Sequence, residues 1–351
     1  MRHGPVRVSV FGKTDPGRTR DHNEDTFLVA DLSAGLASLE PEVRDHVIGP
    51  KGSLFIVADG MGGAAAGEIA SQMAVDLIYD HLASVWAGDT DSSEERFAYR
   101  MREAMEIANE RIHEYAKQHP EMRGMGTTAT VAGVYGAGIW LAQIGDSRGY
   151  LARAGEVIQL TKDQSLMQRL VDAGELTEEE AEHSERRNII LQALGPDPRV
   201  KVDVTHQPLR RGDTLVICSD GLSSQVRREE IGELLRQHPD LAAACGALID
   251  LANGRGGPDN ITVVLARFEG EGLPEPDGAG EVGYQAYALP ESATPTTDHP
   301  ATPAPASAAV APSLEPAPSR GVPSSSLLIL LGLVAVALVA LLTRCRDGIP
   351  S

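Results

Sequence analysis

The sequence predicts an α+β domain over residues 1–268, with one transmembrane helix near the C-terminus. Three observations support this fold class. Short runs of aliphatic and β-branched residues, typical of strands, recur along the first part of the chain. Two long segments among them have helical periodicity instead. Between Thr127 and Leu160, four short strand patterns are separated by turn residues, which indicates an antiparallel meander.

The two predicted helices are defined by apolar residues at three- and four-residue spacing. The first covers residues 64–84. The second covers about residues 94–117, and its start carries Ser92 followed three residues later by Glu95, which is the pattern of a capping box. The residues of the second helix that we expect in the core are Phe97, Met101, Met105, Ala108, Ile112 and Tyr115.

Aspartates stand where strand-like runs meet a glycine, serine or asparagine. They are Asp59, Asp146, Asp220 and Asp259. Aspartate followed by glycine is a common turn, so any one of these positions alone is more typical of a turn than of a ligand. Several strands that end in carboxylates can, however, bring oxygen atoms together from distant parts of a chain. Oxygen-only clusters suit hard divalent cations, so the set favours a metal-dependent hydrolase.

Six segments identify the class of this sequence. In order they read TDPGRTRDHNED (14–25), VADGMGG (57–63), GMGTT (124–128), IGDSR (144–148), CSDGL (218–222) and GPDNIT (257–262). The ordered set resembles the metal-dependent serine/threonine phosphatases of the protein phosphatase 2C type, in their bacterial form. The resemblance covers roughly residues 6–268. It implies a four-layer α-β-β-α sandwich of two antiparallel sheets flanked by helices, and it identifies residues 164–195 as a flap beside the active site.

The same resemblance implies a role for each functional residue. The metal ligands would be Glu24, Asp59, the carbonyl group of Gly60, Asp146, Asp220 and Asp259. Asp59 would bridge two Mn²⁺ or Mg²⁺ ions, and Asp146 would share a third ion with Asp220. Arg20 would grip the substrate phosphate, and Asp25 would hold metal-bound waters in place.

The implied chemistry is hydrolysis of phosphoserine and phosphothreonine monoesters by direct attack of a metal-bridged water. Two metal ions neutralise the anionic phosphate and lower the pKa of the water, so no covalent protein intermediate is required. The expected partners are phosphorylated proteins, among them serine/threonine kinases, whose action the enzyme would reverse. The alternatives are a non-catalytic phosphoprotein-binding scaffold on the same fold, and a phosphatase that acts on a regulatory switch protein.

Composition excludes other classes. The chain has 351 residues and a formal net charge of −19, and it lacks a basic stripe, so nucleic-acid binding is not expected. Its three cysteines are odd in number and sparse, which argues against a disulfide framework and for a reducing compartment.

The C-terminal part changes composition abruptly. Residues 274–323 hold 11 of the 22 prolines, so we expect residues 269–323 to be a disordered linker. An apolar run then predicts a transmembrane helix at 324–343, followed by a short tail at 344–351. Because no signal-peptide pattern precedes the domain, we expect a membrane-anchored protein whose catalytic domain is cytoplasmic. The arginines of the tail oppose that orientation.

Overall fold

The computed structural model describes residues 4–289, apart from 63–65, 185 and 277–281. These residues belong to the first of two compact units, which are Met1–Ser292 and Ala293–Ser351.

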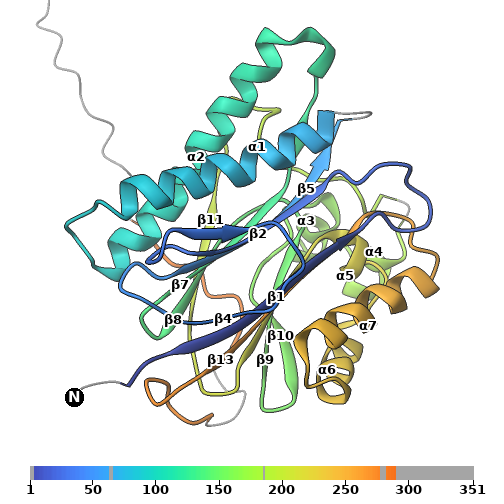
Figure 1. Cartoon of the computed structure of the whole chain (residues 1–351). Coiled ribbons are helices and arrows are strands. Elements are labelled where there is room, and N and C mark those ends of the chain that lie inside the picture. The colour runs from blue at the N-terminus through green and yellow to red at the C-terminus, as the bar shows by residue number, and fades with distance from the viewer. Residues whose placement is uncertain (1–3, 63–65, 185, 277–281, 290–351) are drawn as a thin grey trace, which may run out of the picture. The chain divides into compact units, whose positions relative to one another are not determined.

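Two antiparallel sheets form the middle of the first unit (Figure 1). From edge to edge, the strands of the six-stranded sheet are β10 (Glu156–Gln159), β9 (Arg148–Arg153), β12 (Thr214–Cys218), β13 (Ile261–Glu269), β1 (Arg7–Asp15) and β4 (Arg44–Val47). Those of the seven-stranded sheet are β11 (Asp203–Pro208), β8 (Gly138–Ile144), β7 (Ala129–Tyr135), β5 (Ser53–Met61), β2 (Asp25–Asp31) and β3 (Leu36–Ser38), with β6 (Gly126–Thr127) paired to β5.

Helices cover the outer face of each sheet, as Figure 1 shows. The seven-stranded sheet is covered by α1 (Ala66–His81), which continues into a π-helical turn (Leu82–Trp86), and by α2 (Glu94–Gln118), which is followed by a 3₁₀ turn (Pro120–Met122). The six-stranded sheet is covered by α5 (Asp220–Ser223), α6 (Arg228–Gln237) and α7 (Leu241–Gly254). The predicted four-layer α-β-β-α sandwich is therefore present.

The central strands are apolar throughout because both of their faces are covered. In β5, Leu54 and Ile56 pack under the helices, whereas Phe55 and Val57 pack between the sheets. Side chains that alternate along a strand point to opposite faces, so one continuous apolar run supplies two cores.

Helix α2 matches its predicted position closely but begins at a different cap. Ser93, not Ser92, precedes the first turn, and its hydroxyl accepts a hydrogen bond from the amide of Arg96 at 3.2 Å. Phe97 and Met101 are fully buried, as their spacing predicted.

The predicted meander between Thr127 and Leu160 is divided between the two sheets. β7 pairs with β8 in the seven-stranded sheet, and β9 pairs with β10 in the six-stranded sheet. The chain crosses from one sheet to the other at Gly145–Ser147. Strand periodicity is a local signal, so it located the strands without assigning them to a sheet.

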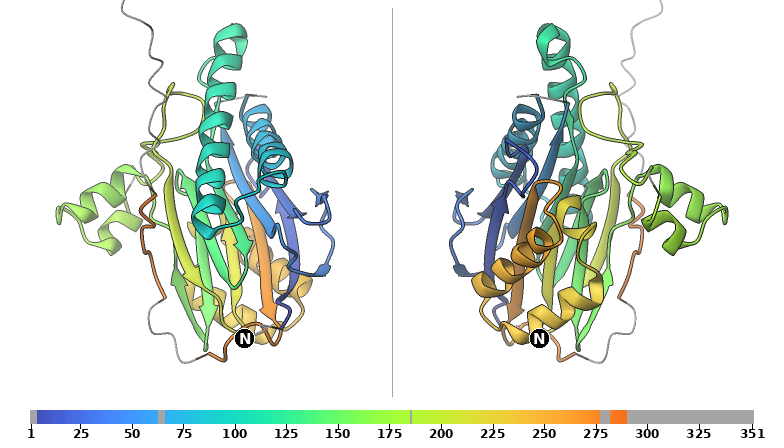
Figure 2. Two further views of the ribbon diagram at one scale, coloured as in Figure 1. Left: turned by 90° about the vertical axis from the view of Figure 1, so that its left-hand side faces the viewer. Right: turned by 90° about the vertical axis from the view of Figure 1, so that its right-hand side faces the viewer.

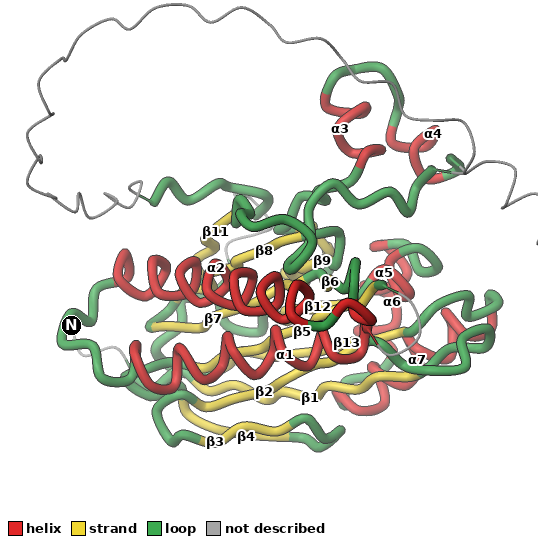
Figure 3. Tube along the Cα trace, turned by 90° about the horizontal axis from the view of Figure 1, so that it is seen from above, coloured by secondary structure: helices red, strands yellow, loops and turns green. Residues whose placement is uncertain are grey.

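Two short helices, α3 (Leu166–Asp172) and α4 (Glu178–Glu182), form the outer part of the predicted flap, residues 164–195. Figures 2 and 3 show both helices projecting from the sandwich. Ser165 and Thr177 cap their N-termini through hydroxyl groups that accept backbone hydrogen bonds.

We expected residues 269–323 to be a disordered linker. Two described parts of its start, residues 269–276 and 282–289, are instead placed on the domain. The amide of Tyr287 donates to the carbonyl of Val204 in edge strand β11 at 2.7 Å, and Ala286 forms a β-bridge with Thr205. Leu273 is also buried. This part of the chain therefore shields an otherwise exposed sheet edge.

The predicted transmembrane helix is corrected. Among the helices of the described residues, none is both long and apolar enough to cross a membrane. The longest, α2, has 25 residues but carries charges along its outer side, and α1 has only 16. The predicted span, residues 324–343, lies outside the described residues. An apolar run of 16 residues falls short of the roughly 20 that a span requires, so hydropathy alone did not establish it. The described structure therefore does not support the predicted membrane anchor or the localisation based on it.

Candidate metal centre

The predicted ligands come together at one end of the sandwich because of how the strands pair. β2 and β5 are in register with Asp25 opposite Asp59. Asp220 follows β12 and Asp259 precedes β13, and these two strands are antiparallel neighbours. The last residues of β12 therefore lie beside the first residues of β13, which brings Asp220 and Asp259 to the same end of the six-stranded sheet.

Asp25 is a buried carboxyl group held by two hydroxyl groups. Ser219 Oγ and Thr262 Oγ1 each donate to Asp25 Oδ2 at 2.7 Å, whereas Asp25 Oδ1 has no hydrogen-bond partner in the described structure. Burial, together with the nearby charges of Asp220 and Asp259, raises the pKa of Asp25 to about 7. One oxygen is thus fixed and the other is left to interact with a ligand.

Asp59 and Asp220 are hydrogen-bonded to each other. Burial raises the pKa of Asp59 well above its ordinary value, and the charges of Asp25, Asp220 and Asp146 raise it further. Burial and the charge of Asp259 also raise the pKa of Asp220, although the hydrogen bond from Asp59 opposes that rise. Like charges this close disfavour ionisation, so the site favours either protons or cations.

Asp146 lies where the chain crosses between the sheets. Its Oδ1 atom is buried and has no hydrogen-bond partner in the described structure. Burial raises the pKa of Asp146 to about 7, and the charges of Asp220 and Asp163 contribute to the rise. The crossing between β8 and β9 therefore brings the Asp146 carboxylate close to Asp220.

Glu24 and Gly60 are adjacent across strands. The amide of Gly60 donates to the carbonyl of Glu24 at 3.1 Å. A side chain on Gly60 would come within 2.2 Å of the carbonyl oxygen of Gly67, so only glycine fits at this close approach. Gly67 itself lies against the Glu24 carboxyl group, whose pKa is raised chiefly by burial.

Arg20 lies at the rim of the group. Its Nη2 atom donates to Asp259 Oδ2 at 2.7 Å, and the arginine side chain is 49% exposed. This hydrogen bond raises the pKa of Arg20. An exposed guanidinium group beside buried carboxylates presents its other donors to solvent, where an anionic ligand can meet them.

The donor set fits hard divalent cations. Asp25 and Asp146 each have an unpartnered buried oxygen, and every predicted ligand atom is oxygen. Among the residues that the structure describes, no three His, Cys, Asp or Glu side chains are yet close enough together to hold one ion. The carboxylates lie near enough to raise one another's pKa values, and some of them are bonded to other partners: Asp59 to Asp220, and Asp259 to Arg20.

Sequence reasoning assigned no role to Ser219 or Thr262. Both lie inside the recognised motifs, one residue before Asp220 and three after Asp259. Their position beside predicted ligands at strand ends was the available signal. That both point at Asp25 depends on contacts across 194 and 237 residues of sequence.

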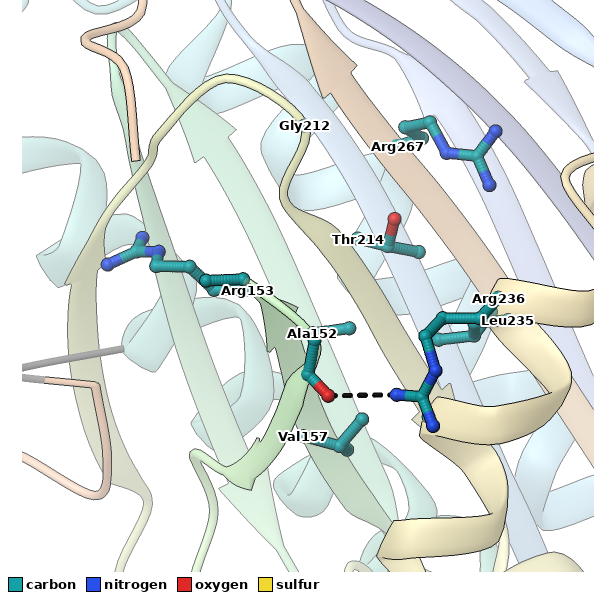
Figure 4. A pocket seen from close by; sticks show the side chains of 11 residues that line it. Ala152, Arg153, Val157, Gly212, Thr214, Leu235, Arg236 and Arg267 are labelled. Atoms are coloured by element: carbon teal, nitrogen blue, oxygen red, sulfur yellow. Dashed lines mark hydrogen bonds between the residues drawn. The ribbon is translucent and has the colours of Figure 1, made fainter. Parts of the chain in front are cut away.

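A separate hollow of about 200 Å³ lies away from these carboxylates (Figure 4). It is lined by the ends of β9, β12 and β13 that are distant from Asp146, Asp220 and Asp259. Of its arginines, Arg153 is bound to Asp213 and Arg236 donates to the carbonyl of Gly155. The hollow is therefore not part of the candidate metal centre.

Comparisons with known proteins agree on one family. A family model described as protein phosphatase 2C matches residues 43–258. The serine/threonine phosphatase stp of Listeria monocytogenes serovar 1/2a is 38% identical over 253 residues, which span 72% of this chain and 93% of that protein. The crystal structure of the Mycobacterium tuberculosis serine/threonine phosphatase PstP/Ppp is 36% identical and has a TM-score of 0.63, covering 75% of this chain and 99% of that one.

A second structure has the same coverage and identity, with a TM-score of 0.61. It is the catalytic domain of the serine/threonine phosphatase PstP in complex with two manganese ions. On the matched family model, the sequence identity and the shared fold, the chain belongs to the protein phosphatase 2C family, as its six motifs predicted.

Proposed function

We infer that this chain is a metal-dependent phosphoprotein phosphatase that hydrolyses phosphoserine and phosphothreonine. The observation that carries this function is the group of buried and half-buried carboxylates around Asp59, with Arg20 at its exposed rim. Buried carboxylates that repel one another need positive charge, and the rim arginine suits an anionic substrate. Its phosphatase relatives, one of them a complex with two manganese ions, support the same chemistry.

The proposed ligands divide between the ions as follows. Asp59, Asp220 and Asp259 would hold one Mn²⁺ or Mg²⁺ ion, and Glu24, Asp59 and the Gly60 carbonyl would hold a second. Asp146 and Asp220 would hold a third. When bound, such ions neutralise the phosphate and lower the pKa of a coordinated water.

The protein itself binds and orients the phosphate group. Arg20 uses one of its five N–H donors on Asp259, which leaves the guanidinium fork for phosphate oxygens. Asp25, with one oxygen fixed by Ser219 and Thr262, keeps its other oxygen in place as an acceptor for water in the site. Its rigid hold favours one orientation of that water, as attack on phosphorus requires.

The proposed substrates are phosphorylated proteins, and serine/threonine kinases are the proposed opposing enzymes. A non-catalytic scaffold on this fold would be expected to lack one or more metal carboxylates. Here Glu24, Asp25, Asp59, Asp220 and Asp259 are all present, which supports catalysis.

The test is hydrolysis of a phosphothreonine peptide by the full chain, with Mn²⁺ and with a chelator. We expect phosphate release that requires Mn²⁺ and is lost in Asp220→Asn, while the variant's thermal stability in chelator is maintained or raised. Binding of Mn²⁺ without hydrolysis would favour the scaffold instead. Absence of Mn²⁺ binding would contradict the proposed centre.

A further inference from the structure

Asn260 ties the loop of residues 16–24 to the rest of the site by three side-chain hydrogen bonds. Its Oδ1 atom accepts from the amide of Glu24 at 2.8 Å. Its Nδ2 atom donates to the carbonyls of Pro16 at 3.0 Å and His22 at 2.9 Å. The residue is only 4% exposed, so each of these polar groups is satisfied within the protein.

The anchored loop carries Arg20. The residue before Asn260 is the predicted ligand Asp259, and the two are also linked by a hydrogen bond. The amide of Asn260 donates to Asp259 Oδ1 at 2.9 Å, and Arg20 donates to Asp259 Oδ2 at 2.7 Å. A main-chain bond from Arg18 to the carbonyl of Gly257, at 2.8 Å, joins the same two segments. The loop and the Asp259 turn therefore form one connected unit.

We propose that Asn260 is a positioning residue that fixes Arg20 and Glu24 relative to Asp259, and so sets the geometry in which the substrate phosphate is bound. The proposal rests on the phosphatase function inferred above. Arg20 lies between two anchor points of Asn260, and Glu24 is itself an anchor point. A loop held at both ends keeps an exposed arginine from sampling unproductive directions, which lowers the ordering cost of substrate binding.

Only an asparagine side chain satisfies this set of partners. The site requires one acceptor for an N–H group and two donors for two carbonyl groups, and a carboxamide supplies both. Aspartate keeps the acceptor but offers at most one donor, and only when protonated. Alanine offers neither, and glutamine is one methylene longer than the space that these distances define.

The experiment compares Asn260→Ala and Asn260→Asp with the wild-type full chain by two measurements. Hydrolysis of a phosphothreonine peptide with Mn²⁺ gives kcat and KM, and hydrogen–deuterium exchange without metal reports on residues 16–24. We expect kcat/KM to fall about 10- to 100-fold in Asn260→Ala, the size of effect that misplacement by about 1 Å causes. Exchange in residues 16–24 should rise in both variants. The Glu24 amide should be better protected in Asn260→Asp than in Asn260→Ala, because aspartate keeps the oxygen that accepts from this amide.

A double-variant cycle tests whether Asn260 acts through the arginine. If it does, the loss of kcat/KM in Arg20→Ala combined with Asn260→Ala will be smaller than the product of the two single losses. The matched control is Asn109→Ala. Asn109 is also a buried asparagine bonded to main-chain groups, those of Gly195 and Asp197, but on α2. The Asn109→Ala variant should be less stable than the wild type, with no change in hydrogen–deuterium exchange at residues 16–24.

Three outcomes would overturn the proposal: unchanged exchange in residues 16–24, an unchanged kcat/KM in a folded Asn260 variant, or full additivity with Arg20→Ala. An inactive wild-type chain would instead refute the proposed phosphatase function. The exchange measurement, which needs neither metal nor substrate, would still decide whether Asn260 anchors the loop.

Discussion

Replacing Asp146 by asparagine should stabilise the metal-free protein at alkaline pH while lowering its Mn²⁺-dependent activity. Burial, with the charges of Asp220 and Asp163, raises the pKa of Asp146 from an ordinary value of 3.8 to about 7. One pKa unit corresponds to about 1.4 kcal/mol, so ionising this group in the folded state costs at most about 4 kcal/mol. Asparagine has nearly the same shape without the charge. After allowing for burial of its amide, we expect a gain of about 2–4 kcal/mol.

The sign of the pH dependence follows from the raised folded-state pKa. The favourable contribution of protonated Asp146 is complete below pH 3.8 and is lost as pH rises through about 7. The advantage of the asparagine variant should therefore be largest at pH 8 and be smaller by about 2.5 kcal/mol at pH 5. Saturating Mn²⁺ should reduce or reverse it, because an ion that binds only the folded wild type stabilises that form.

The assay is urea unfolding in chelator at pH 8 and pH 5, followed by tryptophan fluorescence. The chain has two tryptophans, Trp86 and Trp140, and both are fully buried in the sandwich, so the signal reports unfolding of that unit. Asp250→Asn, at an exposed position on α7, is the control for a general effect of net charge. Equal stability of wild type and Asp146→Asn at pH 8, or a gain that does not change with pH, would refute the reasoning.

Three further predictions concern other parts of the domain. Ser219→Ala removes one donor to Asp25 and also the acceptor of the Thr262 amide, so it should lower kcat/KM about tenfold and lower Tm as well, whereas an unchanged kcat/KM would exclude a role in catalysis. Arg153→Met leaves Asp213 buried without its charged partner and should cost about 3–5 kcal/mol in urea unfolding, most of which the added change Asp213→Leu should restore. A cost below about 1 kcal/mol would mean that this pair is not buried. Tyr287→Ala should lower the unfolding free energy by about 1 kcal/mol in calorimetry, and an unaltered Tm would mean that this side chain does not pack against the domain in solution.

The sequence by itself determined the family and the long helices, and it proposed the residues of the candidate site. Six short motifs in a fixed order were specific enough to identify the protein phosphatase 2C family. Helix α2 lies within one residue of its predicted bounds, because apolar spacing reports on contacts one turn apart. Composition was a weaker guide: it predicted a transmembrane helix that the described structure does not support.

Tertiary structure alone decided which residues support the ligands. Ser219 and Thr262 hold Asp25, and Asn260 holds Glu24, across separations of 194 to 237 residues. These contacts depend on how strands pair and on which sheet each strand joins, as the crossing at Asp146 between β8 and β9 shows. Periodicity within a segment carries information about its own faces only. It does not encode the register between distant strands, because packing across the whole sandwich sets that register.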